Sequence, residues 1–94
     1  MDKLRTPETD RLFEGILSLK TVDECYRFFE DLCTIRELQD MTQRFSVAIL
    51  LKQGLSYPEI LERVRVSTAT ITRINRCVTY GDGGYAEVIS RLKD

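Results

Sequence analysis

Side chains suited to contact with a nucleic acid are concentrated between Ser67 and Arg76, which read Ser-Thr-Ala-Thr-Ile-Thr-Arg-Ile-Asn-Arg. Arginine reaches guanine edges or phosphates, hydroxyls bond phosphates or bases, and a small residue lets a backbone come close to a groove. The same residue types also occur on ordinary solvated helix faces. If this stretch is helical, its outward face carries six candidate DNA-contacting residues: Ser67, Thr68, Ala69, Thr72, Arg73 and Arg76.

The surrounding residues predict two short helices that would position this face. Gly54 can end the preceding helix, and Ser56 and Glu59 form a capping box with Pro58 in the first turn. Ser67 is the next cap. Two helices this short cross rather than stack, which predicts a helix-turn-helix. Its inward positions would be Ile60, Val64, Val66, Ile71 and Ile74.

One residue departs from the usual pattern of such hairpins. The turn position that is most often glycine is Arg65 here. If that position needs a positive φ, arginine costs about 1 kcal/mol. The alternative to a DNA-binding unit is a helical protein–protein interaction module whose polar hairpin face binds protein.

Charge is distributed unevenly along the 94 residues. The net charge is −1, but residues 41–80 hold six Lys/Arg and two acids, a net +4, whereas residues 1–40 carry −4. A local basic field steers a polyanion better than a diffuse total does. Because the basic segment coincides with the polar helix face, the charge pattern favours double-stranded DNA as a partner.

Composition argues against several other classes of protein. Histidine is absent, which removes the commonest metal ligand and general base. Cys25, Cys33 and Cys77 lack Cys-x-x-Cys spacing and lie in apolar helical patterns, so we expect buried free thiols. No phosphate-cradling glycine loop or nucleophile elbow occurs. We therefore expect no enzyme, metal site or cofactor. Without a signal peptide or membrane span, we expect a cytoplasmic protein.

Apolar periodicity and cap residues predict an all-α chain of about six helices forming one domain over residues 1–94. Three Ser/Thr caps with Glu three residues on make the helix starts well defined. The expected segments are dimerisation helices within about 7–53 (roughly 7–19, 22–32 and 35–53), the helix-turn-helix at about 56–79, and a C-terminal helix at about 85–92.

The second expected helix is apolar around much of its circumference. Few of its positions are polar, because six are apolar: Val22, Cys25, Tyr26, Phe28, Phe29 and Leu32. A helix buried on several sides needs more neighbours than a 94-residue chain readily supplies. This predicts a homodimer in which the first helices wrap around those of a second copy. A monomer whose apolar stripes meet each other is the simpler alternative.

The order of elements and the Ala69–Arg73 stretch resemble the tryptophan repressor family, whose recognition helix opens in a similar way. The chain is most similar to the YerC/YecD branch of that family, and the similarity covers nearly the whole chain. The segments that carry it are Leu17–Lys20, Glu24–Phe29, Leu32–Cys33, Ser67–Arg73 and Arg76–Gly81.

The resemblance implies a six-helix intertwined homodimer that binds operator DNA through paired helix-turn-helix units. It adds Ser56 and Tyr57 to the expected DNA contacts and supports Thr68, Ala69 and Thr72. In the tryptophan-responsive member the indole lies between two arginines. One of these arginines is followed by a glycine, which leaves room for the ligand. Arg73 matches one arginine, Gln43 takes the place of the other with Arg44 beside it, and Ile74 replaces the glycine. These vestigial corepressor positions imply that tryptophan does not control this protein, and leave any small-molecule effector unknown.

The sequence therefore predicts a homodimeric, sequence-specific, DNA-binding transcriptional regulator that acts as a repressor and is independent of tryptophan. Ile74 has two alternative placements. If its side chain packs inward, a slot with one arginine wall survives. If it packs into the slot, the hairpin is stabilised without a ligand.

Overall fold

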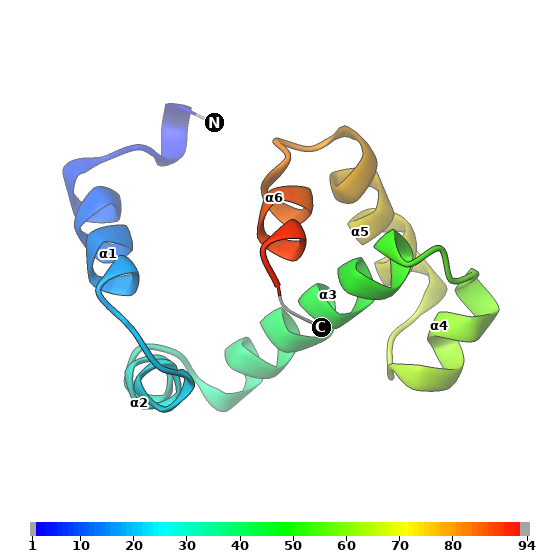
Figure 1. The fold of residues 1–94 in the computed structure, drawn as a ribbon, viewed down its shortest axis with the longest axis horizontal. Coiled ribbons are helices and arrows are strands. Elements are labelled where there is room, and N and C mark those ends of the chain that lie inside the picture. Colours follow the sequence, from blue (N-terminus) through cyan, green and yellow to red (C-terminus); the bar gives the residue numbers. More distant parts are fainter. Residues whose placement is uncertain (1, 93–94) are drawn as a thin grey trace. The chain divides into compact units, whose positions relative to one another are not determined.

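The computed structural model describes residues 2–92 and contains only helices and their connections in that range. The structure has six α-helices in this range, labelled in Figure 1, which confirms the predicted all-α class. A short 3₁₀ turn, Asp2–Leu4, precedes them. The helices are α1 (Pro7–Leu17), α2 (Val22–Leu32), α3 (Ile35–Lys52), α4 (Tyr57–Arg63), α5 (Thr68–Tyr80) and α6 (Gly84–Ser90).

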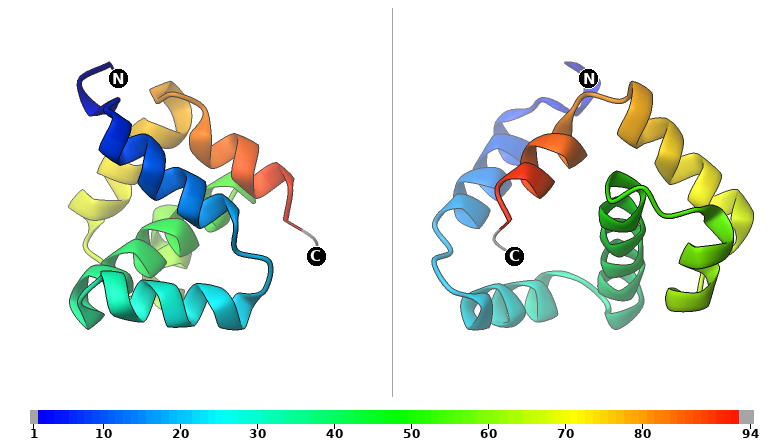
Figure 2. Two further views of the ribbon diagram at one scale, coloured as in Figure 1. Left: turned by 90° about the vertical axis from the view of Figure 1, so that its left-hand side faces the viewer. Right: turned by 45° about the vertical axis from the view of Figure 1, so that its right-hand side comes forward.

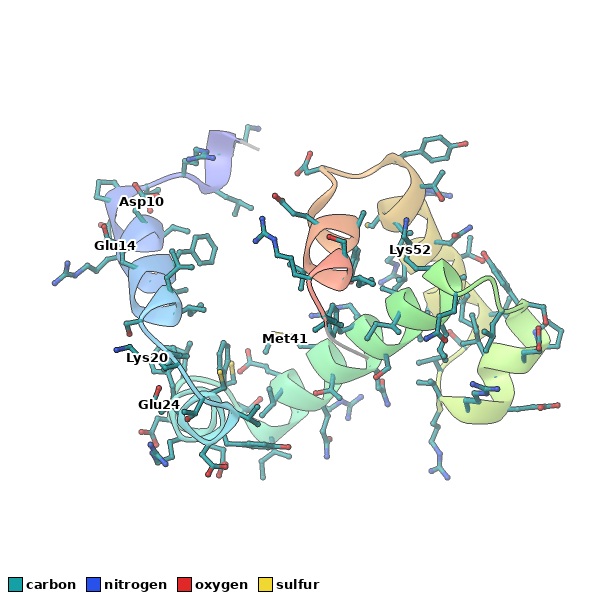
Figure 3. All side chains as sticks on the ribbon, viewed as in Figure 1. Asp10, Glu14, Lys20, Glu24, Met41 and Lys52 are labelled. Carbon is teal, nitrogen blue, oxygen red and sulfur yellow. The ribbon has the colours of Figure 1, made fainter. Side chains whose placement is uncertain are left out.

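Hydroxyl caps start most of the helices, as the sequence predicts. The side chains of Thr6, Thr21, Ser56 and Ser67 each accept a hydrogen bond from the backbone N–H three residues on. The reciprocal bond of a capping box is present at Ser56 and Thr34, whose N–H groups donate to Glu59 and Glu37. At α2 the pattern differs, because Glu24 accepts from the N–H of Lys20 instead of the cap residue. Lys20 and Glu24 lie together there (Figure 3).

Two helices are shorter than their periodicity predicts. α1 ends at Leu17, because Ser18 donates its backbone N–H and its hydroxyl to the carbonyl of Gly15, and Leu19 bonds Ile16. These tighter bonds, three residues apart, close the helix. α6 ends at Ser90 for the same reason, since Arg91 and Leu92 donate to the carbonyls three residues earlier.

The chain divides into two compact units, with the boundary between Leu38 and Gln39. The first unit contains α1, α2 and the start of α3. Neither α1 nor α2 has a buried residue, and large apolar side chains are exposed on both. Leu17 is 83% exposed, Val22 71% and Tyr26 58%. Within α2, the rings of Phe28 and Phe29 meet edge to face at 5.5 Å. The apolar surface of these helices is therefore not covered within the first unit.

The second unit holds the hydrophobic core. Its buried members come from three helices: Val47 and Ala48 of α3, Ile60 of α4, and Ile71 and Ile74 of α5. Three of the five positions expected to be inward, Ile60, Ile71 and Ile74, are thus buried, and the valines of the turn pack against them half-buried. The third element needed by the hairpin is the C-terminal half of α3, which ends at Lys52 (Figure 3). α5 leads into α6 through a glycine-containing loop, seen in both views of Figure 2.

The α4–α5 turn does not need a glycine. Within residues 2–92 only Gly54 and Gly83 have positive φ, so Arg65 carries no left-handed strain. The N–H of Val66 donates to the carbonyl of Val64 at 3.0 Å, which makes Arg65 the centre of a three-residue inverse γ-turn. The expected cost of arginine at this position is therefore not incurred.

The expectation that the cysteines are buried is wrong for this chain by itself. Cys25 and Cys77 are exposed, and Cys33 is half-buried; all three are free thiols. Cys25 lies on α2, which has no buried residue, and Cys77 lies on a flank of α5 between the buried Ile74 and the exposed Arg73. No helix in the described range is both long enough and apolar enough to span a membrane.

Candidate nucleic-acid interface

The outward face of α5 is polar and aligned along the helix. Ala69, Arg73, Arg76 and Tyr80 follow one another at intervals of four, three and four residues, so they share one stripe. All four are exposed, and Tyr80 is 84% exposed. Thr68 and Thr72 lie beside this stripe and are also exposed. The opposite stripe, which holds Ile71 and Ile74, is buried, so packing against α3 and α4 determines which face of α5 meets solvent.

Hydrogen bonds within α5 limit what its hydroxyls can offer a partner. Ser67 accepts from the N–H of Thr70 at 3.1 Å and shares a bond with its hydroxyl at 3.0 Å. Thr72 donates its hydroxyl to the carbonyl of Thr68 at 3.0 Å. Thr72 therefore presents a methyl group and a hydroxyl acceptor, which suit a thymine methyl or a base amino group better than a phosphate.

The two arginines of the stripe supply the positive charge of the face. Arg73 and Arg76 are three residues apart, and both are exposed. No carboxylate within residues 2–92 forms an ion pair with either guanidinium. The first turn of α5 contains no acidic residue. This face therefore has unopposed donors for an anionic ligand.

The start of α4 contributes the remaining predicted contacts. Ser56 is exposed, and its hydroxyl accepts a hydrogen bond from the N–H of Glu59 at 3.3 Å. Tyr57 is half-buried and packs against the core, so only part of its ring is accessible. Hydrogen bonds from the backbone N–H and then the hydroxyl of Ser56, with help from the charge of Arg63, lower the pKa of Glu59 below its ordinary value of 4.5.

The vestigial corepressor positions all fall within the second unit. Gln43 is half-buried, whereas Arg44 and Arg73 are exposed. Ile74 is 4% exposed and belongs to the core cluster with Val47 and Ile60. The side chain thus takes the inward placement of the two alternatives left open by the sequence, which is the one that leaves a slot with Arg73 as its single arginine wall.

Arg65 is an exposed basic residue that the sequence patterns did not include among the expected DNA contacts. Arg65 is exposed at the centre of the turn that precedes α5. The sequence signal was the alternation of Val64, Arg65 and Val66, because apolar neighbours on both sides turn the middle residue outward when the backbone is extended.

The buried stripe of α5, with a polar and basic face opposite, is the arrangement expected of a protein of the helix-turn-helix class. The sequence profile of the Trp repressor protein family matches residues 7–93. The chain is 50% identical over 94 residues to the uncharacterized protein YerC of Bacillus subtilis (strain 168), covering all of this chain and 90% of that protein. The chain therefore belongs to the Trp repressor family.

Two crystal structures resemble the whole chain. A TrpR-like protein from Eubacterium eligens ATCC 27750 is 45% identical, with a TM-score of 0.91 and complete coverage of both chains. A candidate Trp repressor from Staphylococcus aureus is 43% identical, again with a TM-score of 0.91, over 96% of this chain and 90% of that one. These similarities confirm the predicted family and its fold.

Proposed function

We propose that this protein is a sequence-specific transcriptional regulator, acting as a repressor, that binds double-stranded DNA as a homodimer without requiring tryptophan. The observation that carries the proposal is the exposed face of α5, where Ala69, Arg73 and Arg76 share one stripe opposite the buried Ile71 and Ile74. Membership of the Trp repressor family supports the same partner.

Each contact residue would have a distinct role in this proposal. Ala69 allows close approach to the groove floor, and Thr68 and Thr72 face base edges. Arg73 and Arg76 bind phosphates or guanine edges. Ser56, Tyr57 and Ser67 lie at the starts of α4 and α5, where side chains meet the DNA backbone in such motifs.

The homodimer supplies the symmetry that an operator needs. The apolar surface of α1 and α2, including the exposed Leu17 and Val22, would be covered by a second copy, so that residues 1–94 act as one dimeric domain. Two α5 helices would then enter successive major grooves about 34 Å apart, on a roughly palindromic site.

The proposal can be tested by selecting duplexes from a random library and measuring binding of the enriched sequence by gel shift at two salt concentrations. A DNA-binding protein should enrich a partly palindromic sequence, and its affinity should fall steeply with salt. Ala69→Leu should reduce the affinity by about tenfold or more, because the larger side chain meets the groove floor.

The matched control is Ser90→Leu, which adds similar bulk at an exposed position of α6. This variant should bind as the unmodified protein does. If Ala69→Leu leaves both affinity and sequence preference unchanged, α5 does not enter the major groove. A failure to enrich any duplex would favour the alternative, a helical module that binds protein through the same face.

A further inference from the structure

Arg65 projects outward from the α4–α5 turn between two inward valines. The bond from the N–H of Val66 to the carbonyl of Val64 closes the turn around Arg65. Val64, with φ −129° and ψ 135°, is extended, and both valines pack half-buried against the core. Arg65 is exposed. Its side chain therefore makes no contribution to the core and leaves the turn at its apex.

Arg65 has no ion-pair or hydrogen-bond partner for its side chain among the residues that the structure describes. Between residues 2 and 92, no carboxylate forms an ion pair with Arg65 and no carbonyl accepts a hydrogen bond from it. Arg63 differs, because it follows Glu59 by one helical turn and helps to lower the pKa of that carboxyl. The guanidinium of Arg65 thus remains available to an external anion.

We propose that Arg65 binds a backbone phosphate of the duplex at the edge of the groove that α5 enters. The inference rests on the proposed function and adds a contact to it. Arg65 lies two residues before Ser67, the cap of α5, so it is carried to the rim of the groove whenever that helix enters. A guanidinium offers a phosphate two parallel N–H donors, and such a contact positions a protein without reading bases.

The test uses the full-length protein and a duplex that it has selected from a random library. Arg65→Gln removes the charge and keeps a polar side chain. A phosphate contact contributes about 0.9 to the slope of log affinity against log salt, and a dimer carries Arg65 twice. The slope should therefore fall by about 1.8, and the affinity at 0.1 M salt by about 60-fold, alike for the selected and for a random duplex. Arg65→Lys should keep most of the slope.

Arg91→Gln is the matched control, since it removes another exposed arginine from the same unit, one that is paired with Glu87 at 3.0 Å. It should leave the slope unchanged, and thermal melting should show all three variants folded. An unchanged slope in Arg65→Gln, or an equal fall in Arg91→Gln, would overturn the inference while the selected duplex still supports DNA binding. If the unmodified protein binds no duplex, the proposed function itself fails, and the inference with it.

Discussion

Ile74 is the residue that most separates this chain from a tryptophan-controlled hairpin. Its side chain is 4% exposed and completes the core formed by Val47, Ala48, Ile60 and Ile71. Truncating a buried isoleucine usually costs about 2–5 kcal/mol. The hairpin core is thus stabilised by this inward side chain, and the missing arginine wall at Gln43 is the reason to expect no response to tryptophan.

We therefore expect free tryptophan to leave DNA binding unchanged. Gln43 lacks the cation–π energy of an arginine wall, about 0.5–2 kcal/mol, so an indole placed beside Arg73 should bind weakly. Titration calorimetry with millimolar L-tryptophan, and gel shifts with and without it, measure both effects. Micromolar binding, or a gain in DNA affinity, would mean that a working slot exists despite Gln43 and Ile74.

Glu59 links the capping box of α4 to pH. Its pKa is lowered by hydrogen bonds from the N–H and hydroxyl of Ser56. The folded state therefore favours the ionised form of this carboxyl. A carboxyl with a lowered folded pKa contributes stability that is present above the unfolded value of 4.5 and lost as pH falls through the folded value.

Glu59→Gln should accordingly reduce the part of the unfolding free energy that changes below pH 4.5. Urea denaturation at a series of pH values compares this variant with Glu62→Gln, which removes an exposed carboxylate of the same helix that takes no part in the box. Equal pH profiles for the two variants would show that the box does not carry this dependence.

At the scale of elements, the α5–α6 connection depends on glycine at one position and not at the next. Gly83 has φ +87°, a left-handed conformation that disfavours other residues, whereas Gly84 begins α6 and has open space around its Cα. Gly83→Ala should lower the unfolding free energy by about 1–2 kcal/mol. Gly84→Ala should raise it by about 0.4–1 kcal/mol, because alanine restricts the unfolded chain.

Denaturant unfolding of Gly83→Ala and Gly84→Ala measures the two changes in unfolding free energy. Each variant adds one methyl group, at adjacent positions of the chain. Gly81 shows a third situation, since a Cβ there would meet the carbonyl oxygen of Cys77, and would lie 3.2 Å from its carbonyl carbon. If Gly83→Ala were as stable as the unmodified protein, the left-handed turn would not be required between α5 and α6.

At the scale of the molecule, the exposed apolar residues of α1 and α2 predict self-association. Phe13 is 55% exposed and Tyr26 58%, although both are large and apolar. We expect sedimentation at tens of micromolar to show a dimer, and Phe13→Glu to shift it toward monomer by placing a charge in the apolar contact.

Leu61→Gln, at a 42% exposed apolar position of α4, is the control and should remain dimeric, because the proposed association involves the first helices and not the hairpin. A monomer of the unmodified protein at these concentrations would exclude the proposed assembly, and with it the pairing of two α5 helices on DNA.

Local sequence was sufficient to predict the helices and most of their starts. The caps at Thr21, Ser56 and Ser67 and the inward Ile71 and Ile74 depend on residues within one or two turns of each other, so spacing alone reveals them. The family resemblance also followed from short segments, and the profile match over residues 7–93 confirms it.

Tertiary structure decided what depends on packing between helices. Cys77 follows an apolar pattern yet is exposed, since the core covers the neighbouring Ile74 but not this flank of α5. The sequence left two placements open for the side chain of Ile74. In the structure it lies inward, in the core with Val47, Ala48 and Ile60. The turn at Arg65 needed no glycine, because the bond from the N–H of Val66 to the carbonyl of Val64 closes it at negative φ while both valines pack on the core.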